Sequence, residues 1–222
     1  MLALITGTSG GIGSAIAKYF LRQGWDVCGL DTAPAVIMDS RYRHYIADVR
    51  DPDSFPEGIE PEVVINCAGV QNTGHDIDVN LKGAINISER YAIGNDQLRS
   101  VVNIGSASAH TGSEFPEYAA SKGGLLTYTK TLALRLAPQA ICNSIDPGGV
   151  MTDLNRCVIE DEALWNQIME LTPLKRWAEP EEIAEWVYFV GVTNRFMTGQ
   201  NLLIDGGEAG NAKFIWREDE TV

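Results

Sequence analysis

The sequence predicts a single α/β domain built as a doubly wound parallel sheet with helices on both faces. Short apolar runs alternate along the chain with longer segments of helical periodicity, which favours parallel strands joined by helical crossovers. The run at 63–66, Val-Val-Ile-Asn, also lacks the alternation of a half-exposed strand, as expected when both faces of a sheet are covered. At 222 residues, the chain suits one domain spanning residues 1–222.

The first half of the chain alternates strands with two helical patterns. The opening apolar run ends in a glycine-rich turn, and the segment after it places Ile16, Phe20 and Leu21 at helical spacing before Gly24 closes it. The predicted strands cover 2–5, 26–30, 44–46 and 63–66, and the predicted helices cover 13–23 and 79–95.

The second half continues the same alternation. A strand separates the helix at 79–95 from the longest helical pattern, and the last helix opens with Pro180 at an early helical position, where proline is favoured. The predicted strands cover 101–104, 140–145 and 200–204, and the predicted helices cover 117–136 and 179–190.

Composition and charge exclude several functions. The formal net charge is −13, and such a surface repels phosphate backbones, so we expect no nucleic-acid partner. No apolar run approaches the roughly 18 residues of a membrane span. Because a strand is predicted from residue 2, we expect no secretory presequence. The four cysteines lack the paired spacing of a metal site, so we expect no metal and a reducing, cytoplasmic location.

The glycine-rich turn predicts a nucleotide site. It reads Thr6-Gly7-Thr8-Ser9-Gly10-Gly11-Ile12-Gly13, directly after a strand and at the start of a helix. Glycines there let the main chain approach a pyrophosphate, which binds where helix N–H groups and the helix dipole favour an anion. The simpler alternative is an ordinary tight turn. The residues that we expect to contact the cofactor in this turn are Gly7, Ser9, Gly10, Gly11 and Ile12.

Asp31 ends the second predicted strand, 18 residues after Gly13. A carboxylate in that place accepts hydrogen bonds from both ribose hydroxyls of an adenosine and repels a 2′-phosphate, so NAD(H) is favoured over NADP(H). The absence of Arg and Lys from the glycine-rich turn and from the neighbours of Asp31 supports this preference. The alternative interpretation is an aspartate that forms a turn or caps a helix.

Tyr118 and Lys122 are four residues apart at the start of a predicted helix and so share one face. A nearby ammonium group favours the phenolate form of a tyrosine, which can then exchange a proton with an alcohol or a ketone. Such a pair alone is more typical of an exposed helix surface. Here Ser106 follows the strand at 101–104 at its carboxyl end, where open α/β sheets bind ligands.

Together these motifs resemble the short-chain dehydrogenase/reductase family in its single-domain form, which has a Rossmann fold. The glycine-rich turn matches the family's T-G-x-x-x-G-x-G, and Tyr118 to Lys122 matches its Y-x-x-x-K. Cys67 departs from the family pattern N-N-A-G, where an asparagine stands. The other matching positions are Asp48, Val49, Asn66, Ala68, Gly69, Asn80, Ser106, Pro147, Gly148, Val150 and Thr152.

The resemblance implies roles for the matching residues. Ser106 would orient the substrate oxygen, Tyr118 would be the acid/base, and Lys122 would favour the phenolate and bind the nicotinamide ribose. Asn80 would hold a water in the proton relay. The cofactor contacts that it implies are Asp48 and Val49 at the adenine, Pro147, Gly148, Val150 and Thr152 at the nicotinamide, and Asn66, Ala68 and Gly69 between them.

The resemblance also leads to expectations about the substrate and assembly. A lid over residues 148–175 would supply an apolar pocket for a small apolar or cyclic alcohol or ketone; its apolar side chains could instead only pack the lid. His110 is expected to have no role, although it could reach the pocket. We expect a homotetramer or homodimer that uses the two longest helices, with the tail 208–222 packed on a neighbouring subunit. The alternatives are a non-catalytic nucleotide sensor or scaffold and a 3-oxoacyl-thioester reductase.

The motif spacing predicts that the adenosine half of the domain is shortened. Asp48 follows Asp31 by only 17 residues, a stretch that includes Pro34. This leaves too little room for both a full helix and the next strand. We therefore expect the helix after the second strand to be short or absent, and the adenine to be more exposed.

Overall fold

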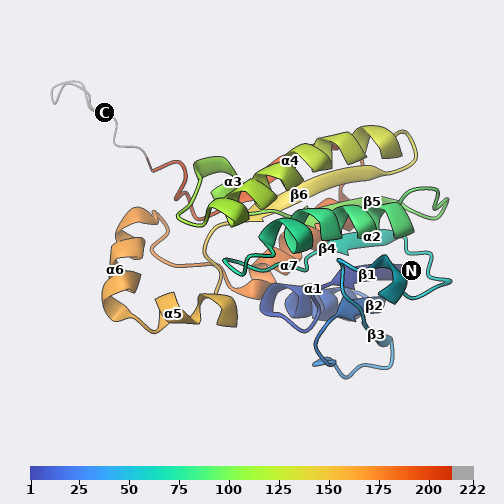
Figure 1. Cartoon of the computed structure of the whole chain (residues 1–222), viewed down its shortest axis with the longest axis horizontal. Helices are drawn as coiled ribbons and strands as arrows, with labels where there is room; N and C mark the ends of the chain where they lie inside the picture. The colour runs from blue at the N-terminus through green and yellow to red at the C-terminus, as the bar shows by residue number, and fades with distance from the viewer. Residues whose placement is uncertain (212–222) are drawn as a thin grey trace.

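The chain folds around a seven-stranded parallel sheet with the strand order β3-β2-β1-β4-β5-β6-β7. A computed structural model of the protein describes residues 1–211, and Figure 1 shows the arrangement of its elements. The predicted fold class is confirmed. The strands are β1 (Leu2–Thr6), β2 (Asp26–Asp31), β3 (Tyr42–Ile46), β4 (Val63–Asn66), β5 (Ser100–Ile104), β6 (Ile141–Pro147) and β7 (Asn201–Ile204).

Helices cover both faces of this sheet (Figure 1). Helices α1 (Gly11–Arg22) and α7 (Pro180–Tyr188) pack against each other on one face. The other face carries α2 (Ala84–Tyr91) and α4 (Pro116–Leu136). The remaining helices are the π-helical η2 (Ile77–Gly83) and η4 (Phe189–Thr193), the 3-10 turns η1 (Pro52–Ser54) and η3 (Asp153–Asn155), and α3 (Ser108–Thr111), α5 (Arg156–Ile159) and α6 (Glu162–Leu171).

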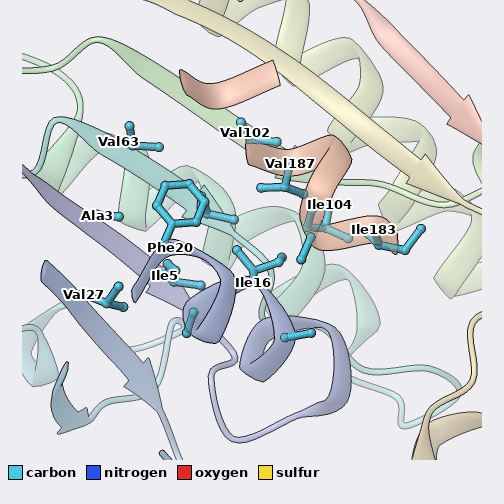
Figure 2. Close-up of a cluster of buried hydrophobic side chains, with 14 of the residues drawn as sticks. Ala3, Ile5, Ile16, Phe20, Val27, Val63, Val102, Ile104, Ile183 and Val187 are labelled. Atoms are coloured by element: carbon cyan, nitrogen blue, oxygen red, sulfur yellow. The ribbon is translucent and has the colours of Figure 1, made fainter. Parts of the chain in front are cut away.

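Alternate side chains of the central strand enter two separate cores. Ile5 packs with Phe20 of α1 and Val187 of α7, in the cluster that Figure 2 shows. Leu4 points to the other face and packs with Ile87 of α2 and Leu132 of α4. Because successive strand residues face opposite sides, both faces need apolar residues. This explains the continuous apolar run at the start of the chain.

The strand order reverses at the junction of β1 with β4, which pair in parallel. In an open α/β sheet, the connections from the two strands at such a point run to opposite faces of the sheet, and ligands bind in the crevice that opens outside the carboxyl ends. The glycine-rich turn follows β1 and the segment Cys67–Gly69 follows β4, so the fold brings two predicted cofactor segments to one point.

The predicted shortening of the adenosine half is confirmed. No helix occurs between β2 and β3, and only the single turn η1 lies between β3 and β4. The helix predicted at 79–95 differs in its first turns, which are π-helical before α2 begins at Ala84. Likewise, the helix predicted at 179–190 passes from α7 into η4.

Two further expectations concern membrane spans and the tail. Within residues 1–211, no helix is both long and apolar enough to cross a bilayer. The C-terminal residues proposed to pack on a neighbouring subunit, Phe214 to Trp216, lie outside the described residues.

Candidate active site

The glycine-rich turn is shaped by close contact between main-chain segments. Gly7 has a φ of +76°, in the left-handed region, and a β-carbon added at Gly13 would lie 2.1 Å from the carbonyl oxygen of Gly7. Helix α1 then begins at Gly11 with no side-chain cap and no acidic residue in its first turn. Its N–H groups therefore remain available to an anion, as the predicted pyrophosphate site requires.

Asp31 connects this turn to the start of the β2–β3 connection. One carboxylate oxygen accepts a hydrogen bond from the N–H of Ser9 at 2.9 Å, and the other accepts one from the N–H of Ala33 at 2.9 Å. The Ser9 hydroxyl donates to the carbonyl of Pro34 at 2.8 Å. Each carboxylate oxygen keeps a further lone pair, so Asp31 can still accept a ribose hydroxyl.

Two side chains of β3 support this connection, and the sequence interpretation missed both. The Tyr42 hydroxyl donates to Thr8 Oγ1 at 2.8 Å and also lies 2.8 Å from His44 Nδ1. His44 Nε2 lies 2.9 Å from the carbonyl oxygen of Ala33. These polar contacts hold the connection where a longer domain would use a helix. Tyr42 and His44 are two residues apart on one strand and so share a face; this spacing was the signal that could have paired them.

Thr6 joins the turn after β1 to the turn after β4. Its buried hydroxyl oxygen accepts hydrogen bonds from the N–H groups of Cys67 at 3.0 Å and Ala68 at 2.9 Å. Gly7 packs directly against the main chain of Ala68. Asn66 is used differently, because its amide donates internally to Asn103 Oδ1 at 2.8 Å and to the hydroxyl of Ser88.

The four predicted catalytic residues come from three elements. Asn80 lies in η2, Ser106 follows β5, and Tyr118 and Lys122 lie in α4. Lys122 is 5% exposed, and its Nζ donates to the carbonyl of Ile104 at 2.8 Å and lies 5.8 Å from the centroid of the Tyr118 ring. The ammonium group is thereby held beside the tyrosine, away from bulk water.

Asn80 links this group to the turn after β4. Its amide donates to the hydroxyl of Ser121 at 3.0 Å and to the carbonyl of Val70, and its Oδ1 accepts from the N–H of Val70 at 2.8 Å. Gly69 lies next to both Asn80 Oδ1 and Lys122 Nζ. The structure therefore brings Gly69, Asn80 and Lys122 together.

Ser106 is oriented by the helix that follows it. Its Oγ accepts a hydrogen bond from the N–H of Ser108, the first residue of α3, at 3.2 Å. Because that oxygen already accepts a bond, its own hydrogen is free to be donated. The short helix α3 packs on α4, which carries Tyr118. This contact places Ser106 and Tyr118 on neighbouring elements.

The predicted adenine residues Asp48 and Val49 follow β3. Asp48 forms an ion pair with Arg50 at 2.5 Å, and this hydrogen bond holds the pKa of the Asp48 carboxyl below its usual value. Val49 is buried against Gly83, where η2 ends. Asn86 of α2 donates to the carbonyl of Val49 at 3.0 Å. The cofactor positions in this segment are thus fixed by α2 and η2.

The predicted nicotinamide turn lies at the carboxyl end of β6. Gly148 donates its N–H to the carbonyl of Ile204 at 3.0 Å, and Val150 is buried and pairs with Ala178. The side chain of Thr152 packs against Gly11. The start of the lid therefore meets the start of α1, and two predicted cofactor segments from opposite ends of the chain are in contact.

The lid contains α5 and α6, and its apolar residues differ in burial. Met169 is buried, and the Trp165 ring packs edge-on against Trp177, with 5.1 Å between centroids. Leu154 and Leu171 are exposed. Trp177 itself lies against Gly149, directly after the nicotinamide turn. Part of the lid thus packs on the body of the domain, while other apolar side chains face outward.

His110 differs from the expectation that it has no role. It lies on α3, and its Nε2 is 2.7 Å from Oδ2 of Asp146 in β6. Asp146 is 0% exposed, and burial raises the pKa of its carboxyl, while the hydrogen bond from His110 opposes that rise. An acidic residue within an apolar strand, directly before Pro147, was the signal that could have found this pair.

Among residues 1–211, no group of three or more His, Cys, Asp or Glu side chains is arranged to hold a metal ion.

Comparisons with known proteins match nearly the whole chain. A family model described as "Enoyl-(Acyl carrier protein) reductase" matches residues 63–208, and one described as "NAD dependent epimerase/dehydratase family" matches residues 3–122. An uncharacterized oxidoreductase of Schizosaccharomyces pombe is 32% identical over 96% of this chain and 93% of its own length. A 3-oxoacyl-[acyl-carrier-protein] reductase of Staphylococcus epidermidis is 30% identical over 92% of this chain and 97% of its own.

Solved structures share the fold. The ligand-free aldohexose dehydrogenase of Thermoplasma acidophilum has a TM-score of 0.87 and 29% identity, covering 98% of this chain and 97% of that one. A 4-hydroxyisoleucine dehydrogenase mutant complexed with NADH and succinate has a TM-score of 0.87 and 27% identity, over 96% and 100%. A putative 2-deoxy-D-gluconate 3-dehydrogenase of Agrobacterium tumefaciens with bound NADP has a TM-score of 0.85 and 27% identity, covering 94% of this chain and 96% of that one.

The Thr6 hydroxyl yields a testable prediction for stability. Replacing Thr6 with Val keeps the shape but leaves the half-buried N–H groups of Cys67 and Ala68 without their acceptor, which costs about 1–3 kcal/mol for each group that stays unpaired. We expect the Thr6→Val protein to lose about 2 kcal/mol or more in its free energy of unfolding, measured by urea denaturation. Thr6→Ser retains the hydroxyl and is the control. Equal stability of the Val and Ser variants would contradict this role.

Proposed function

Because the chain belongs to the short-chain dehydrogenase/reductase family, we propose that it is an NAD(H)-dependent oxidoreductase that interconverts a secondary alcohol and a ketone. The observation that carries the proposal is the buried Lys122, held by the carbonyl of Ile104 beside the Tyr118 ring. A fixed ammonium group next to a tyrosine favours the phenolate that alcohol oxidation needs. A purely structural helix pair has no reason to bury this charge.

The residues present fit a dinucleotide. The uncapped start of α1 would hold the pyrophosphate, Asp31 would accept from the adenosine ribose, and the turn at Pro147 and Gly148 would meet the nicotinamide. The bound dinucleotide supplies or accepts the hydride. Contact of Thr152 with Gly11 supports a single continuous site across these segments.

The protein's own groups handle the proton and the orientation. The Ser106 hydroxyl, with its hydrogen free, donates to the substrate oxygen. Tyr118 takes the proton of the alcohol during oxidation and returns it during reduction, with the Lys122 ammonium group held beside its ring. Asn80, bonded to Val70 and Ser121, would hold the water of the proton relay. Proton transfer by a placed side chain of this kind is typically worth about 10²–10⁴ in rate.

The substrate that we propose is a small apolar or cyclic molecule. The lid residue Trp165, which packs edge-on against Trp177 near the nicotinamide turn, supports an apolar pocket wall. The second candidate is reduction of a 3-oxoacyl thioester, which the similarity to the Staphylococcus epidermidis enzyme favours. The net charge of −13 argues against an acidic carrier protein as partner.

Assembly and location are also proposals. We propose a homodimer or homotetramer that uses the faces of α2 and α4, the assembly that the resemblance to the family implies. A cytoplasmic location remains a prediction. Light scattering of the purified protein should give a mass of two or four chains, and a single-chain mass at micromolar concentration would contradict the assembly.

Replacing Tyr118 with Phe tests the proposed catalysis. The variant loses the only group assigned to exchange the substrate proton, so we expect turnover to fall at least 100-fold, within the range expected for general acid–base catalysis. NADH affinity should change less than about threefold, a difference under 1 kcal/mol. Turnover of a panel of alcohols and ketones is followed by NADH absorbance, and affinity by calorimetry.

This panel separates the alternatives. A 3-oxoacyl thioester included among the substrates would be preferred if the second candidate were correct. A wild-type protein that binds NADH but turns over no member of the panel would favour the non-catalytic sensor or scaffold.

The preference for NAD(H) depends on the charge of Asp31. Asp31→Asn keeps an acceptor for the N–H of Ser9, gives up the one for the N–H of Ala33, and removes the repulsion of a 2′-phosphate. We expect wild-type kcat/KM to be at least tenfold higher with NADH than with NADPH, and the variant to shift this ratio toward NADPH by about tenfold, or about 1.4 kcal/mol. Asp26→Asn, at the opposite end of β2, is the matched control. Equal efficiency of the wild type with both cofactors would refute the preference.

A further inference from the structure

A hydrogen-bonded pair, His110 and Asp146, lies beside Ser106 and has no part in the chemistry assigned above. His110 Nε2 and Asp146 Oδ2 are 2.7 Å apart; the His110 side chain is 29% exposed and the Asp146 side chain is fully buried. The second carboxylate oxygen, Oδ1, is buried and has no hydrogen-bond partner in the part of the chain that the structure describes. Burying a carboxylate in this way is costly, and an apolar pair of similar volume is often equally stable. Stability alone therefore does not account for the pair.

The two residues that flank Ser106 form main-chain hydrogen bonds with the two residues that flank Asp146. The N–H of Gly105 donates to the carbonyl of Ile145 at 2.8 Å, and the N–H of Ala107 donates to the carbonyl of Pro147 at 2.8 Å. The two segments are thus locked in register, with Asp146 next to Ser106.

The Asp146 side chain also reaches the main chain beside Ser106. A β-carbon added at Gly105 would lie 2.1 Å from Asp146 Oδ1. Only glycine leaves room at position 105 for this carboxylate. The carboxylate therefore fills the space directly behind the Ser106 segment.

His110 connects helix α3, which follows Ser106, to Asp146 in β6. Helix α3 begins after Ser106, whose carbonyl accepts from the N–H of Ala109 at 3.0 Å, while the N–H of Ser108 orients the Ser106 hydroxyl. A helix of four residues has little stability of its own. Its position against β6 depends on contacts such as the bond from His110 to Asp146.

We propose that the Asp146–His110 pair is a positioning device for Ser106. The hydrogen bond fixes α3 against the carboxyl end of β6, and the fixed N–H of Ser108 then directs the hydrogen of the Ser106 hydroxyl toward the substrate oxygen. His110 and Asp146 are positioning residues, since they act through Ser106. This inference rests on the proposed function, in which Ser106 orients the substrate.

A double-mutant cycle tests the pair. His110→Phe keeps a ring but removes the donor, and we expect kcat to fall about tenfold for the alcohol or ketone with the highest turnover in the panel. In a Ser106→Ala background, His110→Phe should cause less than about a twofold further loss, because residues that act through one another are not additive. His110→Gln, which places an amide N–H near the same point, should stay within about threefold of wild type. His75→Phe, at an exposed histidine in the connection before η2, is the control.

A second measurement needs no substrate. Amide hydrogen exchange over residues 105–112 should be faster in His110→Phe than in wild type and restored in His110→Gln, with β1 unchanged in all three. Unchanged exchange in the Phe variant would overturn the positioning role, as would equal losses of kcat in the two backgrounds or a Gln variant as slow as Phe. Failure of the proposed function would appear instead as a wild type without turnover.

Discussion

The hydroxyl of Thr6 is the contact on which the arrangement of the site depends. It accepts the N–H groups of Cys67 and Ala68, and so joins the turns after β1 and β4 where the strand order reverses. Buried N–H groups need an acceptor, and here one side chain supplies it for two residues. On one side of this junction, Gly69 lies next to Asn80 and Lys122. On the other side, Gly7 is followed in the same turn by Ser9, whose N–H donates to Asp31. The predicted cofactor residues and the predicted catalytic residues are therefore both positioned relative to Thr6.

The charges at the carboxyl edge of the sheet are each held by a specific partner. Lys122 is bound by the carbonyl of Ile104, Asp31 by two N–H groups, and Asp146 by His110. Such partners are required because an uncompensated charge is expensive to bury. They also fix the geometry of the charged groups. Fixed positions of the charged groups suit a site in which a hydride and a proton move over short distances.

The missing helix between β2 and β3 shows how a shortened domain keeps its cofactor edge in place. Tyr42, His44 and Ser9 bind the connection through hydrogen bonds to Thr8, Ala33 and Pro34. A helix would have covered the sheet with apolar contacts, whereas these bonds hold only the main chain near Asp31. The shorter chain thus lacks a helix over this part of the sheet, but the Asp31 carboxylate is still held in position.

The sequence by itself determined the fold class, the alternation of strands and helices along the chain and the placement of Tyr118 and Lys122 on one helix face. These features depend on local periodicity and spacing, which are written in short stretches of chain. It also predicted the missing helix, because 17 residues cannot hold both a helix and a strand.

Only the tertiary structure decided how side chains far apart in the chain meet. The bond from His110 to Asp146 joins residues 36 positions apart, Asn66 turns inward to Asn103, and Trp177 lies against Gly149. Such contacts depend on the register between strands and on the path of loops. No local pattern of residues encodes either of these, so the partners of His110 and Asn66 became visible only once the strands were placed side by side.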